Sequence, residues 1–267
     1  MSQHFRFIRR YTGPLRAAIL DWSGTTADKY VLAPAVVFAD VFEKHKVPIS
    51  MKEARLPMGL RKDLHIKEIT EIPEVRQRWK EVYGRDPNQG DVDNMFKDFV
   101  PMQLGCLRKY TDLIPGTIGS STGFVRSMVD ILLEEGKKQG FHPDCTVAGD
   151  EVVNGARPKP FMVYRNLDLL DVATIQSVVK VDDTVSGIGE ALNAGCWGVG
   201  VARYSNYMDI NTLDQESQLS EAEIQTRLEH SRDLLRKAGA HYVVDSIKDL
   251  PEVCADINTR LARGESP

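Results

Sequence analysis

Four groups of polar residues stand at, or shortly after, the ends of short apolar runs in the sequence. They are Asp21, the pair Ser121-Thr122, Arg157 and the pair Asp182-Asp183. If the runs are parallel strands, these groups meet at one edge of a sheet, because the carboxyl ends of parallel strands share that edge. Together they supply carboxylates for Mg²⁺ or for nucleophilic attack, hydroxyl donors for phosphate oxygens, and a cation to balance anionic charge.

Asp21 by itself has two interpretations. The apolar run Ala17 to Leu20 is typical of a buried parallel strand, and Asp21 ends it abruptly before Ser23, Gly24 and two threonines. The aspartate is then either an ordinary turn residue or a nucleophile and metal ligand that faces a phosphate. The other three groups favour the second interpretation.

Short apolar runs alternate with helical patterns over most of the chain. This alternation predicts an α/β fold with a doubly wound parallel sheet. Strands are expected at residues 17–20, 118–121, 145–148, 178–182, 197–201 and 241–244, with helices at 125–139, 160–170, 188–194 and 220–237 and a last helix that ends near 263.

Residues 31–110 interrupt this alternation with a series of helical segments. Pro34 suits the first turn of the first of them, and Ser50 with Glu53 has the pattern of a capping box that begins the second. The sequence therefore predicts two domains. These are a Rossmann-like catalytic core of residues 1–30 and 111–267, and an all-helical cap of residues 31–110 inserted after the first strand.

Composition narrows the class of protein. The 267 residues are 42% apolar and 27% charged, as in ordinary globular proteins, and the net charge of −4 gives no general attraction to nucleic acid or anionic membranes. The four cysteines lack C-x-x-C spacing, which argues against a zinc site or a disulfide framework. We predict a cytoplasmic protein, with mitochondrial targeting as an alternative because residues 1–16 hold four arginines and no acid.

The order D-x-x-G-T, [ST], [KR] and DD resembles the haloacid dehalogenase superfamily. A closer resemblance, to the phosphonoacetaldehyde hydrolases, is carried by DWSGTTAD, IGSSTGF, NGARPKP and KVDDTVSGI, and by Pro57-Met58-Gly59 followed by Lys62. The last motif is the specific one, because most relatives in the superfamily have no lysine that reaches in from the cap.

This resemblance implies a hydrolase that cleaves the carbon–phosphorus bond of a phosphonate, with Mg²⁺, no organic cofactor, and a homodimer joined through the cap. Lys62 would form an imine with the substrate aldehyde, Asp21 would accept the phosphoryl group, and His65 would assist proton transfers. The metal ligands implied are Asp21, the backbone carbonyl of Ser23, and Asp183; the substrate-binding residues are Met58, Gly59, Thr122, Gly123 and Arg157.

Physical reasoning supports the lysine independently. A lysine attacks a carbonyl only as the neutral amine, which is scarce at neutral pH when the pKa is near its usual value. Lys62 is expected in the first turn of a helix, where the positive end of the dipole and the neighbouring Arg61 disfavour the ammonium. The alternative places Lys62 with Arg61 and Lys67 on a solvated face, and His65, three residues further on, would then be a surface histidine.

Ser23 bears on two other functions. In the superfamily that this chain resembles, the phosphatases carry an aspartate two residues after the nucleophile, where it protonates the leaving oxygen. This chain has a serine there. The difference disfavours the first alternative, a phosphatase or phosphomutase that acts on a phosphate monoester. Trp22 and Met58 flank key positions, and each is either core or part of the aldehyde pocket.

Three positions depart from the family pattern, and two of these departures matter most. Leu113 to Thr117 runs almost directly into the strand at Ile118, although a parallel crossover needs about a dozen residues or more. This shortened crossover motivates a further alternative, an inactive variant that serves as a partner subunit. The other departure is Gly187, where some relatives place an acid for which Asp182 is a candidate substitute; Phe124 also lacks a hydroxyl that some relatives have.

Overall fold

A parallel sheet lies at the centre of the molecule. The computed structural model describes residues 10–114 and 120–267, with the side chain of Ser120 excepted. The sheet has the strand order β1-β4-β5-β6, formed by β1 (Ala17–Leu20), β4 (Val178–Asp182), β5 (Trp197–Val201) and β6 (Tyr242–Val244). Two short strands, β2 (Ser120–Ser121) and β3 (Thr146–Val147), pair in parallel beside β1. The parallel α/β fold predicted from the sequence is confirmed.

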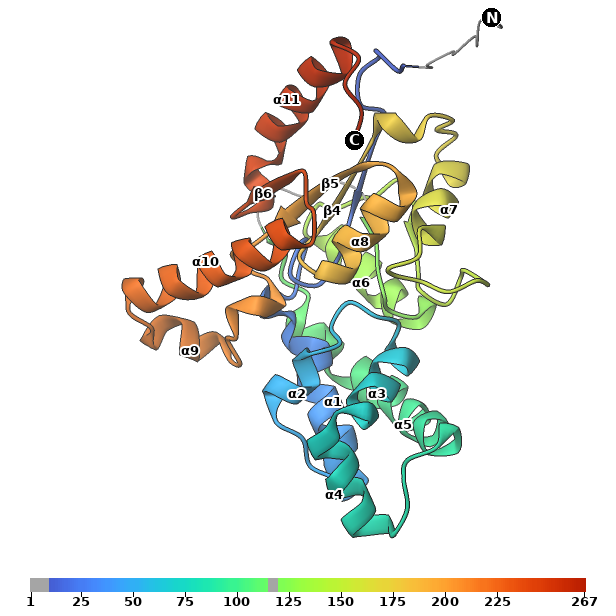
Figure 1. Ribbon diagram of the computed structural model, residues 1–267, viewed down its shortest axis with the longest axis vertical. Coiled ribbons are helices and arrows are strands. Elements are labelled where there is room, and N and C mark those ends of the chain that lie inside the picture. Colours follow the sequence, from blue (N-terminus) through green and yellow to red (C-terminus); the bar gives the residue numbers. More distant parts are fainter. Residues whose placement is uncertain (1–9, 115–119) are drawn as a thin grey trace, which may run out of the picture.

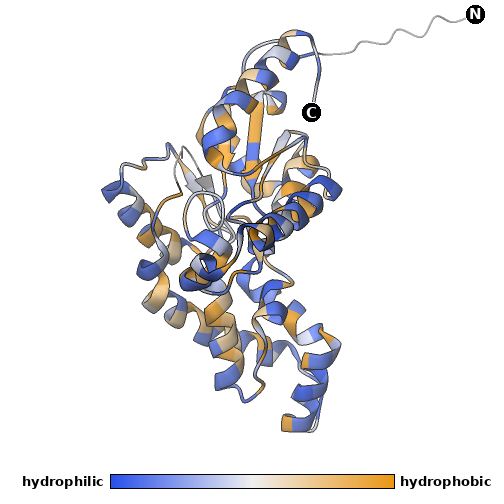
Figure 2. Ribbon diagram, turned by 90° about the vertical axis from the view of Figure 1, so that its left-hand side faces the viewer, coloured by the Kyte–Doolittle hydropathy of each residue, from blue (hydrophilic) through white to orange (hydrophobic). Residues whose placement is uncertain are grey.

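Helices cover both faces of the sheet (Figure 1). Alternate residues of a strand point to opposite faces, so Val178 packs with α7 and α8 while Val179 and Val181 pack with α11. In Figure 2 the sheet strands stand out as hydrophobic, in keeping with their burial on both sides. The helices here are α6 (Arg126–Lys138), α7 (Phe161–Leu169), α8 (Val185–Ala194), α9 (Leu213–Gln218), α10 (Glu221–Lys237) and α11 (Leu250–Ala262); α9 was not expected.

Five further helices pack together beyond the carboxyl ends of the strands, and we call them the helical lobe (Figure 1). Phe38 and Phe99 stack at its centre with ring centroids 4.5 Å apart, and the predicted capping box of Ser50 with Glu53 is present. The lobe consists of α1 (Leu32–Lys44), α2 (Met51–Arg55), α3 (Lys62–Glu71), α4 (Pro73–Tyr83) and α5 (Gln89–Leu107).

The helical lobe sits close against the strand ends. Arg55 at the end of α2 is buried and donates to the carbonyl oxygens of Tyr30 and Ile210, at 2.7 and 2.8 Å. Gly59, with a φ of +95°, passes so near the first turn of α8 that a Cβ at this position would overlap the hydroxyl of Ser186. The glycine is therefore needed both for its backbone conformation and for this approach.

The shortened crossover falls on residues 115–119, outside the described residues. Within the described part of the chain, no helix has the length and apolar character needed to cross a membrane.

Candidate active site

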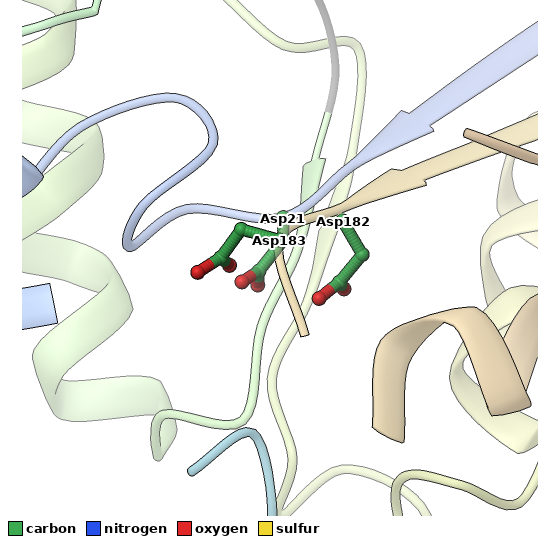
Figure 3. Close-up of side chains that lie close together, drawn as sticks. All are labelled: Asp21, Asp182 and Asp183. Carbon is green, nitrogen blue, oxygen red and sulfur yellow. The ribbon is translucent and has the colours of Figure 1, made fainter. Parts of the chain in front are cut away.

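Three aspartates from two neighbouring strands form the centre of the site. Asp21 directly follows β1, Asp182 ends β4, and Asp183 comes next, so the pairing of β1 with β4 brings them together (Figure 3). One carboxylate oxygen from each lies within 4.8 Å of the other two, and all three side chains are buried. Arg157 joins them, with Nη2 2.6 Å from Oδ1 of Asp21 and 3.2 Å from Oδ2 of Asp182. The shared sheet edge thus collects groups that are distant in sequence.

The three carboxylates differ in their partners. Burial raises the pKa of Asp183 well above its usual range, and repulsion from Asp182 and Asp21 raises it further. Burial also raises the pKa of Asp21, against the opposing effect of Arg157. Although burial acts on Asp182 in the same direction, Arg157 and Lys180 outweigh it, so the pKa of Asp182 is lowered. Asp21 and Asp183 are therefore the two carboxylates in which burial outweighs the nearby positive charge.

The residues present fit a divalent cation. Oδ1 of Asp183 is buried and has no hydrogen-bond partner among the described residues, while Oδ2 accepts from the backbone N–H of Asn206 at 3.1 Å. Oxygen ligands of this kind suit Mg²⁺. Gly24, with a φ of +80°, lets the loop after β1 pass close to Asp183, since a Cβ there would overlap Oδ2. The loop that carries Ser23 is thereby held beside the carboxylate pair.

A small pocket opens beside Asp21, with eleven residues in its lining. All five expected substrate-binding residues line it, together with Asp21, Ser23 and Lys62, whereas His65 and Asp183 do not. The lining is formed by Asp21, Ser23, Val31, Met58, Gly59, Lys62, Thr122, Gly123, Phe124, Arg157 and Thr184.

Lys62 is the first residue of α3 and enters the pocket from the helical lobe. Its side chain is only 4% exposed, and its Nζ lies 4.9 Å from the ring centroid of Phe124. Burial lowers its pKa to about 8, with Arg157 as the like charge that lowers it further. The solvated-face alternative is therefore wrong. Arg61 does not act as expected, because its guanidinium forms a bidentate pair with Asp63 at 2.6 and 2.7 Å.

His65 is buried, which contradicts the surface alternative. Its ring stacks on Phe38 with centroids 3.8 Å apart, and its Nε2 lies 2.8 Å from the carbonyl oxygen of Ala54, which fixes Nε2 as the donor. Burial lowers the pKa of His65 well below its usual value, and the charge of Lys62 adds to this effect. A neutral histidine behind the lysine results, and its part in proton transfer stays a prediction.

Two aromatic residues near the site, Trp22 and Phe124, lie in different surroundings. Trp22 packs edge-on against Phe141, with centroids 5.1 Å apart, and belongs to the core rather than to the pocket. Phe124 lines the pocket under the lysine ammonium, although it attracted attention only as a missing hydroxyl. Its position directly after the Ser-Thr-Gly motif is the signal that could have identified it.

Comparison with known proteins extends this picture. No family model matches the sequence. The chain is 38% identical to the phosphonoacetaldehyde hydrolase of Syntrophobacter fumaroxidans over 276 residues, which cover 98% of this chain and 99% of the relative. The aligned length exceeds the 267 residues of the chain, so some positions of the relative have no counterpart here.

Solved structures agree. A phosphonoacetaldehyde hydrolase-like protein from Oleispira antarctica has a TM-score of 0.94 and 35% identity, with 99% of this chain and all of that chain covered. A haloacid dehalogenase-like protein from Agrobacterium tumefaciens, at 20% identity and a TM-score of 0.58 over 90% of this chain and 98% of its own, shares the fold. Extended identity to the hydrolases over nearly the whole chain, on a haloacid dehalogenase-like fold, shows that this chain belongs to the phosphonoacetaldehyde hydrolase family.

Proposed function

We propose that the chain hydrolyses phosphonoacetaldehyde to acetaldehyde and phosphate. The observation that carries this proposal is the meeting of Lys62 and Asp21, which come from the helical lobe and from the sheet and line the same small pocket. An amine at one end and a carboxylate at the other match the two ends of a small phosphonate that bears an aldehyde. The names of the relatives point to the same substrate.

Lys62 supplies the electron sink. Its neutral amine adds to the aldehyde carbon, and loss of water gives an iminium. The iminium then accepts the electron pair of the carbon–phosphorus bond as that bond breaks, which leaves an enamine on the lysine. Protonation of the enamine carbon and addition of water release acetaldehyde and restore the amine. The pKa of about 8 leaves a useful fraction of Lys62 neutral near physiological pH.

Asp21 receives the phosphoryl group. Its carboxylate attacks phosphorus as the carbon–phosphorus bond breaks, and water then hydrolyses the aspartyl-phosphate to phosphate and free carboxylate. Arg157 already holds Oδ1 of Asp21 at 2.6 Å and, with Thr122, lines the space for the phosphonate oxygens. Asp21, Asp183 and the backbone carbonyl of Ser23 would hold Mg²⁺, whose positive charge would reduce the repulsion between the carboxylate and the phosphonate.

One assay distinguishes the three candidate functions, which are a phosphonoacetaldehyde hydrolase, a monoester phosphatase and an inactive partner subunit. A coupled assay for acetaldehyde, run with phosphate detection on the purified Mg²⁺-loaded protein, should give equal amounts of both products from phosphonoacetaldehyde. Phosphate released from sugar phosphates without need of Lys62 would instead support a monoester phosphatase. A protein that melts cooperatively, gains stability from Mg²⁺ and releases neither product would support the inactive partner.

The pH dependence of the reaction should follow the lysine. Because the amine reacts only when deprotonated, we expect kcat/KM to fall about tenfold per pH unit below an inflection near pH 8, and to level off above it. Mg²⁺ adds positive charge near the amine and moves the inflection downward. His65 stays neutral and should add no inflection near its usual value. A profile that is flat from pH 6 to 9, under conditions where chemistry limits the rate, would contradict the need for a neutral amine.

Three further expectations remain part of the proposal. Residues 31–110 would form a cap domain, this cap would join two copies into a homodimer, and the protein would act in the cytoplasm. Light scattering coupled to size-exclusion chromatography tests the homodimer, since a monomer mass at micromolar concentration would rule the dimer out.

A further inference from the structure

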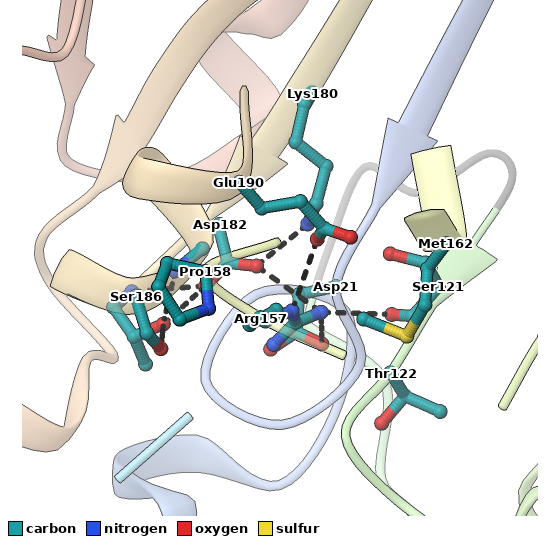
Figure 4. A network of polar contacts seen from close by, with 12 residues as sticks. Asp21, Ser121, Thr122, Arg157, Pro158, Met162, Lys180, Asp182, Ser186 and Glu190 are labelled. Atoms are coloured by element: carbon teal, nitrogen blue, oxygen red, sulfur yellow. Dashed lines mark hydrogen bonds and ion pairs between the residues drawn. The ribbon is translucent and has the colours of Figure 1, made fainter. Parts of the chain in front are cut away.

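Both oxygens of the Asp182 carboxylate have protein partners. Oδ2 accepts from Nζ of Lys180 at 2.6 Å and forms an ion pair with Nη2 of Arg157 at 3.2 Å (Figure 4). Oδ1 accepts from the backbone N–H and the hydroxyl of Thr184 at 3.0 and 2.7 Å. In this Asp182 differs from Asp183, whose Oδ1 has no hydrogen-bond partner among the described residues.

The donors that Asp182 holds include two parts of the pocket wall. Arg157 lines the pocket; its Nε contacts Glu190 at 3.2 Å, and its Nη2 contacts both Asp21 and Asp182, so three carboxylates fix its guanidinium. Thr184 lines the pocket too and caps α8 by accepting from the backbone N–H of Gly187 at 3.1 Å. Asp182 thus ties the pocket guanidinium to the start of a helix.

Gly187 leaves the space in which this carboxylate lies. A Cβ built on Gly187 would overlap Cγ and both oxygens of Asp182. Gly187 lies inside α8, and its φ is outside the left-handed region, so its backbone does not require glycine. The three atoms nearest to a Cβ there all belong to the Asp182 carboxylate.

We propose that Asp182 is a positioning residue that orients Arg157 and Thr184 toward the phosphonate, and that Gly187 lacks a side chain because the Asp182 carboxylate fills its place. The inference rests on the proposed function only for the identity of the anion. It predicts that an acid at position 187 weakens phosphate binding when Asp182 is present, and restores phosphate binding when Asp182 has been removed.

The test compares four proteins loaded with Mg²⁺: wild type, Asp182→Gly, Gly187→Asp and the double variant. The readouts are the dissociation constant of inorganic phosphate and the melting temperature. Each single change should weaken phosphate binding about 10- to 100-fold, the usual effect of removing a group that orients a ligand-binding residue. The double variant should recover to within about tenfold of wild type. A double variant no better than the worse single one would overturn the proposal.

Two more variants separate positioning from folding. Asp182→Asn keeps the shape but turns a donor toward Lys180 and Arg157, so a folded protein with weaker phosphate binding is expected, and wild-type binding would overturn the proposal. Gly187→Ala should lower the melting temperature by about 5 °C through overpacking. The matched control is Gly105→Ala in α5, where a Cβ meets no atom within 4 Å, and a drop as large in this control would overturn the steric argument.

Phosphate binding and melting do not require carbon–phosphorus cleavage. A wild-type protein that binds phosphate but releases no acetaldehyde would therefore refute the proposed function and leave the swap between positions 182 and 187 standing. If the wild type does release acetaldehyde but the double variant does not recover phosphate binding, the swap alone is refuted.

Discussion

Replacing Lys62 with arginine should lower kcat/KM for phosphonoacetaldehyde by about four orders of magnitude or more, since it removes the covalent step. Arginine keeps the positive charge in the pocket but stays protonated and cannot form the iminium. Borohydride added during turnover should reduce the wild-type intermediates to an alkyl group on Lys62 that mass spectrometry locates, and the variant should show none.

The matched control is Lys67→Arg. Lys67 lies on the same helix, α3, but is exposed, so its replacement should leave both the adduct on Lys62 and the rate unchanged. Absence of any adduct in folded, Mg²⁺-loaded wild type, or an adduct on Lys67 alone, would count against the mechanism.

Lys62→Met tests whether loss of activity reflects loss of structure. Burial lowers the pKa of Lys62 to about 8, so below that pH the folded protein holds an ammonium that burial disfavours. Methionine fills a similar volume without that cost. We expect an inactive protein that melts at or above the wild-type temperature at pH 7, and a melting temperature well below wild type would mean that the lysine is needed for the fold.

Asp183→Asn should abolish the stabilisation of the protein by Mg²⁺. Saturating Mg²⁺ at about a hundred times its dissociation constant should raise the wild-type melting temperature by about 5 to 10 °C, through Asp21 and Asp183, the two carboxylates whose pKa values are raised by burial. The variant has lost one of them and should show no rise, together with a loss of activity of about a thousandfold. Differential scanning calorimetry with and without Mg²⁺ measures both melting temperatures.

Without Mg²⁺, the Asp183→Asn variant should be more stable than the wild type. Burial and repulsion raise the pKa of Asp183 well above its usual value, so its charged form destabilises the folded state at neutral pH. The asparagine variant is then the more stable protein at pH 7, and the difference should shrink as the pH falls and Asp183 takes up a proton. Asp144→Asn, which changes an exposed acid, is the control and should alter neither the Mg²⁺ response nor this trend. A persistent Mg²⁺ shift in Asp183→Asn would exclude Asp183 as the metal ligand.

Much of the fold was accessible from local sequence. Short, mainly apolar runs followed by an acid predicted β1 and β4, and the capping box at Ser50 is present where the sequence predicted it. Such features depend on residues a few positions apart, so no distant part of the chain has to be known. The convergence of Asp21, Arg157 and Asp183 also followed, because parallel strands end at one edge.

Burial and charge pairing were decided by tertiary contacts. Nothing near His65 in the sequence shows that Phe38 covers its ring. Nothing near Lys62 shows that the positive charge that lowers its pKa belongs to Arg157, which comes from a loop almost a hundred residues away. The exclusion of a side chain at Gly187 by Asp182 depends on the turn that leads from β4 into α8. The sequence by itself therefore determined which groups gather at the sheet edge. The folded chain decided which of them are paired, neutral or free to react, because those properties depend on neighbours that only folding brings together.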